Sequence, residues 1–230
     1  MDEYLNKLYI LKCNYKTDQP NIVYLKGKYE SLMVDIGGGK ETFKLIQKFW
    51  DENSLEEPDY VVLTHYHWDH AFASSLYKSQ IISSSYTNSK IEEMIKLNPS
   101  TINEFISDDK QPEFCREHLE IEYKDGYKNY LRSSDILCDS FMVIDLGERL
   151  VQILLIPSSH TEGSLAVLDL NTSTLIIGDA SCGKIKGKNF IHDSNKIREL
   201  YSVLENLKFE YVIEGHSRTQ TREEFMNSLY

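Results

Sequence analysis

The amino-acid sequence predicts an α+β fold in which two β-rich halves pack as a sandwich with helices on the outside. Three observations support this prediction. Short apolar runs bounded by turn residues fill residues 9–63, similar runs recur after residue 141, and stretches with helical spacing separate and follow them. With 230 residues, 41% of them hydrophobic, the chain can bury a substantial core. We expect a single domain over residues 1–230.

The first half begins with three strands and a helix. Strands are predicted at Tyr9–Leu11, Ile22–Leu25 and Ser31–Ile36, and the last of them runs into glycines at 37–39. These glycines predict a strand-to-helix turn, because they match neither the dinucleotide-binding pattern nor the P-loop pattern. The helix that follows has a core-facing stripe made of Phe43, Leu45, Ile46 and Phe49.

The second half repeats this plan. Its predicted elements are strands near 141–145, 150–156, 164–169, 174–178 and 210–214, and helices near 195–206 and 220–229. Two such halves, packed through their sheets, would bring the ends of several strands to one edge of the molecule.

A dense group of metal-binding residue types follows the apolar run Tyr60–Leu63. The segment from Thr64 to His70 reads Thr-His-Tyr-His-Trp-Asp-His. Residues two apart share a face of an extended chain, so His65 and His67 can converge on one ion, while Asp69 and His70 lie past the turn. Imidazole suits zinc and other first-row transition ions. The segment therefore makes two metal positions available.

Three later strands end in a similar way. His160 follows the run 151–157, Asp179 follows 174–178, and His216 follows 211–215. Packing requirements alone rarely produce a strand, a turn and a ligand-type side chain in four places. His118 and His192 have no such context, and we expect them to be solvated or satisfied by a neighbouring group.

With these four motifs, the chain resembles the metallo-β-lactamase superfamily. The family signature H-x-H-x-D-H corresponds to His65-x-His67-x-Asp69-His70, and the segments 159–164, 177–179 and 214–217 resemble the later family motifs. The resemblance extends from about Val23 to His216. It implies an αβ/βα four-layer sandwich, here with a helical insertion between the first and second metal motifs.

The resemblance also implies a dinuclear metal centre. The implied ligands are His65, His67 and His160 for one ion, Asp69, His70 and His216 for the other, and Asp179 as the bridge. The cofactors are then two divalent ions, with zinc favoured and iron or manganese as alternatives. Such a pair can lower the pKa of a bridging water to about 7, so that hydroxide serves as the nucleophile. Asp69 is the candidate catalytic residue, because it can orient this water and move its proton.

This chemistry predicts a hydrolase that cleaves a small ester, thioester or lactone. One alternative is a phosphodiesterase acting on a small nucleotide or a phospholipid head group, and another is a non-catalytic or regulatory metal-binding protein. The metal motifs resemble those of glyoxalase II, of the acyl-homoserine lactonases and of the phosphodiesterase branch equally well. The run Cys182-Gly183-Lys184 is similar to a glyoxalase II segment whose lysine helps to bind glutathione, which makes Lys184 a candidate substrate residue. The family's β-lactamases usually replace ligands that this chain keeps, so we do not expect antibiotic hydrolysis.

The segment between His70 and His160 is longer than the intervening strands require. The surplus spans about 86–134, and its apolar spacing predicts helices interrupted at Pro99 and Pro112. This insertion is either a packing cover or a lid whose aromatic residues line an apolar substrate pocket. The candidate pocket residues are Phe105, Tyr123 and Tyr127.

Charge and composition limit the partners to a small-molecule substrate. The chain has 25 basic and 36 acidic residues, a net charge of −11, and no basic stripe that would bind nucleic acid. Its densest basic segment, 184–188, is expected to be a solvated loop, or alternatively a contact for an anionic substrate group. No stretch has the roughly 18–20 apolar residues of a membrane span, and no signal peptide is evident. We expect a cytoplasmic protein whose four scattered cysteines are reduced.

Overall fold

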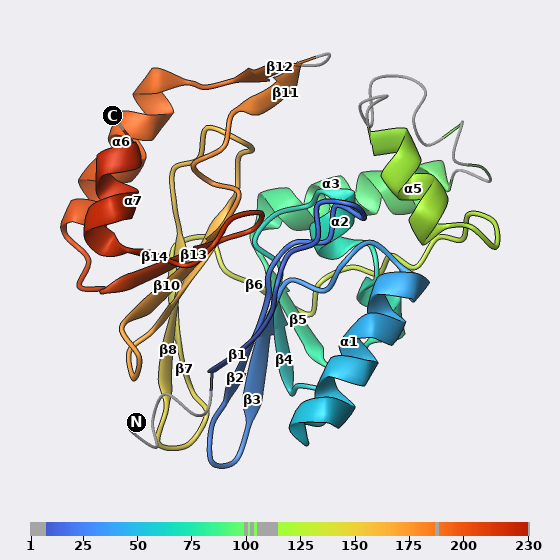
Figure 1. The fold of residues 1–230 in the computed structure, drawn as a ribbon, viewed down its shortest axis with the longest axis horizontal. Helices are drawn as coiled ribbons and strands as arrows, with labels where there is room; N and C mark the ends of the chain where they lie inside the picture. Colours follow the sequence, from blue (N-terminus) through green and yellow to red (C-terminus); the bar gives the residue numbers. More distant parts are fainter. Residues whose placement is uncertain (1–7, 99–100, 102–103, 105–114, 187–188, 230) are drawn as a thin grey trace.

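Two six-stranded sheets pack face to face in the computed structural model, which describes residues 8–98, 101, 104, 115–186 and 189–229. Helices α1, α3 and α5 lie outside the first sheet, and α6 and α7 lie outside the second (Figure 1). The result is the αβ/βα sandwich, which confirms the predicted fold class. No helix in the described ranges is long and apolar enough to cross a membrane.

The first sheet is mixed and has the strand order β1-β2-β3-β4-β5-β6. Its strands are β1 (Leu8–Leu11), β2 (Ile22–Lys26), β3 (Ser31–Val34), β4 (Tyr60–Val62), β5 (Gln80–Ser83) and β6 (Ile136–Leu137). The first three strands are antiparallel, whereas β3 to β6 run parallel. The carboxyl ends of β3 to β6 therefore meet at one edge. The sequence predicted β1 to β4 but neither β5 nor β6.

The helices on the first sheet come from three parts of the chain. They are α1 (Lys40–Asn53), α2 (Trp68–Ala71), the 3-10 turn η2 (Ser74–Leu76), α3 (Ser85–Leu97) and α5 (Arg116–Glu122). The predicted glycine turn is confirmed, because α1 starts directly after Gly39. Helix α3 ends at Asn98 in a left-handed conformation, just before the predicted break at Pro99. The second predicted helix, around Phe105, lies outside the described residues apart from 101 and 104.

The second sheet has the strand order β14-β13-β10-β9-β8-β7. The strands are β7 (Phe141–Asp145), β8 (Leu150–Leu155), β9 (Leu165–Asp169), β10 (Thr174–Gly178), β13 (Tyr211–Glu214) and β14 (Gln220–Thr221), and the covering helices are α6 (Ser194–Glu205) and α7 (Arg222–Ser228). All five predicted strands and both helices are confirmed. Strands β8, β10 and β13 run in the same direction, so their carboxyl ends also share an edge.

One prediction in this half is wrong. The segment expected to be a solvated loop forms a hairpin instead, in which β11 (Lys184–Lys186) pairs antiparallel with β12 (Asn189–Ile191). The alternation Lys-Ile-Lys has the period of two that a strand requires.

Three layers of core hold the sandwich together. In β2, Ile22 and Tyr24 face the helices, while Val23 and Leu25 face the second sheet. The inter-sheet core includes Val62 of β4, and a third cluster joins the second sheet to α6 and α7. Strands buried on both faces explain the nearly continuous apolar runs in the sequence. They also provide a rigid support for the loops at the shared edge.

Candidate metal centre

All seven predicted ligands lie in turns and short elements at this edge. His65 and His67 lie between β4 and α2, Asp69 and His70 lie in α2, His160 lies between β8 and β9, Asp179 follows β10, and His216 follows β13. These ligands form three overlapping groups of three residues, and in each group the ligand atoms lie within 4.8 Å of one another. The structure therefore brings together residues from both halves of the sequence.

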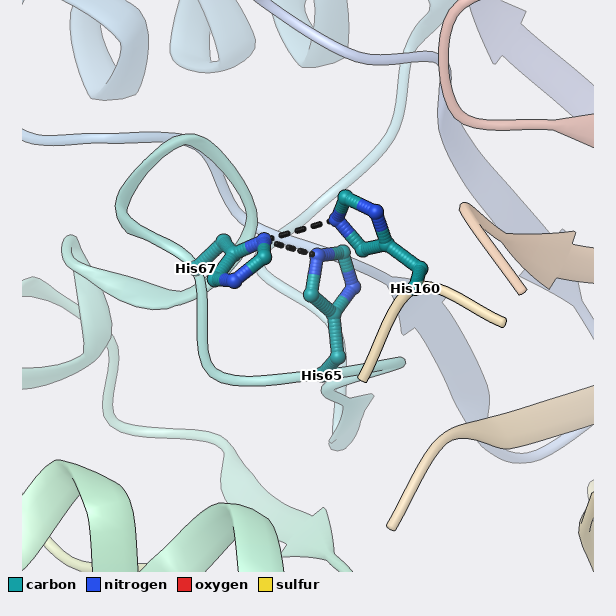
Figure 2. A group of neighbouring side chains, drawn as sticks. All are labelled: His65, His67 and His160. Carbon is teal, nitrogen blue, oxygen red and sulfur yellow. Dashed lines mark hydrogen bonds between the residues drawn. The ribbon is translucent and has the colours of Figure 1, made fainter. Parts of the chain in front are cut away.

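The first cluster consists of three imidazoles (Figure 2). His67 Nδ1 lies 3.1 Å from His65 Nε2 and 2.8 Å from His160 Nε2. His160 Nδ1 donates a hydrogen bond of 2.9 Å to the carbonyl oxygen of Gly183. Because a carbonyl can only accept, this bond leaves the Nε2 lone pair of His160 directed at the cluster.

The second cluster combines two imidazoles with a carboxylate. Asp69 Oδ2 lies 3.0 Å from His216 Nε2 and 3.1 Å from His70 Nε2. Asp179 Oδ2 lies 3.5 Å from His70 Nε2 and 3.7 Å from both His160 Nε2 and His216 Nε2. Asp179 thus faces ligands of both clusters, which is the position a bridging carboxylate requires.

Two polar atoms at the centre show that the site fits a cation. Among the described residues, Asp179 Oδ1 is buried and has no hydrogen-bond partner, and His70 Nε2 is buried with only the carboxylates of Asp69 and Asp179 near it, at 3.1 and 3.5 Å. Leaving a buried polar group unsatisfied costs about 1–3 kcal/mol, and more for a charged group. A divalent ion in each cluster would satisfy these atoms. Histidine nitrogens and carboxylate oxygens are suitable ligands for such ions.

Asp35 supports the second cluster and was missed in the sequence. Its Oδ2 lies 2.7 Å from His70 Nδ1, and its carboxylate also accepts hydrogen bonds from the backbone and hydroxyl of Thr64. A carboxylate on the outer nitrogen orients a histidine and makes it a stronger ligand. The sequence prediction placed Asp35 inside the strand Ser31–Ile36, whereas the observed strand ends at Val34 and Asp35 follows it.

Two glycines allow the ligand loops to approach closely. A Cβ atom at Gly215 would lie 2.2 Å from Asp179 Oδ1, and one at Gly178 would lie 2.4 Å from Thr64 Oγ1. Gly178 also has a φ of +53°, which side chains disfavour. Glycine at both positions is therefore part of how this fold assembles the site.

The two clusters differ in their electrostatics. Burial, reinforced by neighbouring imidazoles, lowers the pKa of His65 well below its usual value and that of His67 to about 3. Burial also opposes the charged form of His216, but Asp179 and Asp69 outweigh it and raise its pKa to about 9. The pKa of His70 is likewise raised well above its usual value, because Asp69, Asp35 and Asp179 outweigh burial.

The acids of the second cluster respond in the opposite direction. Burial alone would raise the pKa of Asp69 and Asp179, yet the positive charges of His70 and His216 hold both pKa values well below the usual range. Without metal, the second cluster is thus a network of buried ion pairs, whereas His65 and His67 in the first cluster are neutral.

Asp18 and His118 extend the charged region beyond the predicted ligands. Burial raises the pKa of Asp18 to about 6, and the negative charge of Asp69 adds to this effect. His118 of α5 places Nδ1 3.8 Å from Asp18 Oδ2. The loop that holds Asp18 is fixed nearby, because the Tyr15 hydroxyl donates to the carbonyl oxygen of His216. No local sequence pattern marks this approach, since it depends on packing between distant segments.

Three of the four predicted substrate residues, Tyr123, Tyr127 and Lys184, lie within the described residues. Tyr123 is 4% exposed, lies in the core, and donates a 2.6 Å hydrogen bond to the Gly38 carbonyl oxygen. Tyr127 packs against its ring at 4.8 Å between centroids. Lys184 is exposed at the start of β11, and Phe105 lies outside the described residues. Substrate binding by these four residues stays a prediction.

Comparison with known families supports the fold and the motifs. The family model described as the Metallo-beta-lactamase superfamily matches residues 15–216, most of the chain. No curated protein is similar enough to this sequence to count as a relative.

Solved structures show the same architecture at low sequence identity. A metallo-beta-lactamase family protein from Thermus thermophilus is 16% identical, with a TM-score of 0.66 over 96% of this chain and 79% of that one. A metallo-beta-lactamase from Pontibacter korlensis is 14% identical, with a TM-score of 0.62 over 96% and 97%. An archaeal superfamily protein from Sulfolobus tokodaii is 17% identical, with a TM-score of 0.61 over 96% and 83%. At such identities the likeness shows the fold alone.

Proposed function

This chain belongs to the metallo-beta-lactamase superfamily, and from that premise we propose that it is a dinuclear metal-dependent hydrolase of small esters, thioesters or lactones. The proposal depends most on one observation. Asp179 Oδ1 is buried without a hydrogen-bond partner among the described residues, at the point where the two ligand clusters meet. Such an arrangement is costly for a protein that binds nothing there.

The residues around the centre have distinct roles in this proposal. Two divalent ions would supply Lewis acidity and lower the pKa of a water to about 7. Asp69, held between His70 and His216, orients that water and accepts its proton through a carboxylate oxygen. The Gly183 carbonyl and Asp35 fix the ring orientation of His160 and His70, so that the ligand nitrogens stay aligned through the reaction.

The distribution of basic residues favours acyl over phosphoryl substrates. A phosphodiester carries charge that a site normally meets with Arg or Lys. Arg218, which follows His216 closely in sequence, instead pairs with Glu224 at 2.8 Å. Lys184 is exposed on the hairpin. With a net charge of −11, the protein would repel anionic substrates at long range.

The test is a metal-reconstituted substrate panel. Protein stripped with a chelator is reloaded separately with zinc, manganese or iron, and metal content is measured with hydrolysis of a carboxylic ester, a thioester, a lactone and a bis-phosphodiester. We expect about two ions per chain and turnover of at least one acyl substrate, with the diester cleaved more slowly.

Two results would count against the proposal. Preferred cleavage of the diester would favour the phosphodiesterase alternative. Full loading with two ions and no turnover of any substrate would favour a non-catalytic metal-binding protein. For variants of the acidic ligands, Asp51→Asn is the control for loss of one negative charge, because Asp51 is exposed on α1 and is not a ligand.

A further inference from the structure

A cavity of about 630 Å³ lies between the loops that follow β10 and β13 and the helices α6 and α7. Ser181 and Cys182, which follow Asp179, and Glu214, which precedes His216, form one part of its lining. The cavity therefore shares a wall with the loops that hold two of the metal ligands. Its volume falls within the range of about 300–1,000 Å³ that is typical of small-molecule sites.

The polar groups in this wall are already satisfied. The Glu214 carboxylate accepts hydrogen bonds from the hydroxyls of Ser181 and Ser217, the latter at 2.7 Å, and from Gln220 Nε2, also at 2.7 Å. Cys182 is a free, partly buried cysteine, a residue type that packs as a small apolar group. The wall thus offers little free polar capacity to a ligand.

The opposite wall supplies apolar surface. Ile197 and Tyr201 of α6 and Leu229 after α7 are partly buried and line it, while the other lining residues of this part, His192, Ser194, Arg198 and Ser228, are polar and exposed. An apolar interior with polar groups at the opening suits an unbranched hydrocarbon chain better than a charged or sugar-like group.

The start of α6 is connected to the ligand loops. The backbone amide of Asp193, the N-cap of α6, donates a 2.7 Å hydrogen bond to the Ser159 hydroxyl. Ser159, which precedes His160, in turn donates its own amide hydrogen to the carbonyl oxygen of Ala180, which follows Asp179. These bonds hold the cavity at a defined position relative to both ligands.

We propose that this cavity binds an unbranched apolar chain of the substrate, so that the enzyme prefers long-chain esters over short ones. The inference rests on the proposed hydrolase function and adds the class of substrate. It also places recognition of the hydrocarbon chain at α6, whereas the sequence analysis proposed segment 86–134 as a lid. In that segment, Tyr123 is buried and its hydroxyl donates a hydrogen bond to the Gly38 carbonyl oxygen.

The hydrocarbon chain of the substrate could belong to the acyl part or to the alcohol part of the ester. A set of three esters distinguishes these two cases. Methyl acetate, methyl decanoate and decyl acetate are compared with the metal-loaded enzyme. Each methylene that enters the cavity should raise kcat/KM about fourfold, which corresponds to ~0.8 kcal/mol. A preference for methyl decanoate assigns the acyl side, and a preference for decyl acetate assigns the alcohol side. Equal rates for all three esters would overturn the proposal.

Substitutions at Ile197 test the location. Ile197→Trp should fill the cavity and lower the long-chain to short-chain ratio of kcat/KM at least tenfold, whereas Ile197→Ala should shift the preference to longer chains. Glu205→Trp adds the same bulk at an exposed position of the same helix, outside the cavity lining, and should leave the ratio as in the wild type. A ratio that changes equally in Ile197→Trp and Glu205→Trp would refute the assignment.

A binding measurement separates this inference from the proposed function. Calorimetry with decyl methyl ketone, which is not hydrolysed, should show binding to the metal-loaded wild type that is at least tenfold weaker in Ile197→Trp, while acetone shows no measurable binding. This pattern would support the cavity even if no ester were cleaved, in which case only the proposed function would fail. Equal affinity for the ketone in wild type and Ile197→Trp would overturn the cavity assignment, whatever the activity.

Discussion

The first metal cluster is made of imidazoles alone, whereas the second combines imidazoles with a carboxylate. At neutral pH and without metal, burial keeps His65 and His67 uncharged, because their pKa values are strongly lowered. The acids beside His70 and His216 raise the pKa of both rings, so these stay protonated. The first cluster thus offers free ligand nitrogens, while the second holds protons that a cation must displace.

We expect proton movement during hydrolysis to occur at the second cluster, since it contains Asp69, the candidate proton acceptor. Four predictions test this contrast between the two clusters.

The largest effect is expected from Asp69→Asn. If Asp69 moves the proton of the attacking water, the amide should reduce kcat by about 10²–10⁴, because general acid–base help is typically of that size. Folding, checked by circular dichroism, should change little, and Asp51→Asn should match the wild type. Near-normal kcat in Asp69→Asn that carries both ions would show that Asp69 does not transfer the proton.

The next effect is the pH dependence of metal affinity. Binding at His216 requires the neutral ring, and a pKa of about 9 leaves only about 1% of it neutral at pH 7. Deprotonation of His216 alone should therefore raise the affinity for the second ion about 50-fold between pH 7 and pH 9, with proton release. Titration calorimetry in buffers of different ionisation enthalpy measures the metal affinity and the number of protons released. Equal pH dependence for the two ions would contradict the comparison between the clusters.

A smaller effect is expected from Asp35→Asn. Loss of the carboxylate that contacts His70 Nδ1 should lower the affinity for the second ion by about 10–100-fold. Outer-shell partners of a ligating histidine typically have effects of this size. The first ion should be held nearly as in the wild type. Competition with a chromophoric chelator gives the two constants separately, and an equal loss at both clusters would show a general disruption of the edge.

Much of this structure could be predicted from local sequence pattern. Apolar runs end shortly before His65, His160, Asp179 and His216 in the sequence, and the structure brings all of these residues to one edge. Asp35 lies in the predicted strand Ser31–Ile36 but follows the observed one, which ends at Val34. Local patterning worked here because each strand that precedes a ligand buries apolar side chains in the core and ends at that edge.

Features that depend on contacts between distant segments could not be predicted. The pairing of Asp18 with His118 joins a loop of the first sheet to a helix of the insertion, and neither segment alone indicates it. The cavity beside α6 likewise forms only when Cys182, Ile197 and Leu229 meet. Tyr123 was predicted to line a substrate pocket because it is aromatic, and in the structure it packs in the hydrophobic core. An aromatic ring suits a core as well as a pocket.

The smallest effect concerns Asp18 and tests how far the negative field of the second cluster extends. The folded-state pKa of about 6 lies above the ordinary value of 3.8, so the native protein binds this proton more tightly than the unfolded chain. The resulting stabilisation is complete below about pH 4 and is lost as the pH rises through 6. At pH 7.5 the ionised carboxylate should destabilise the metal-free protein by about 1–2 kcal/mol, less than the full shift implies because the side chain is 28% exposed.

Asp18→Asn should therefore stabilise the metal-free protein at pH 7.5 and change little at pH 4, as measured by urea unfolding with a chelator present. With both ions bound, the gain should shrink, because the cations offset the charges of Asp69 and Asp179 that act on Asp18. The exposed variant Asp51→Asn controls for a general loss of negative charge. A stabilisation of equal size at both pH values, or one that persists in the loaded protein, would mean that Asp18 does not sense the second cluster.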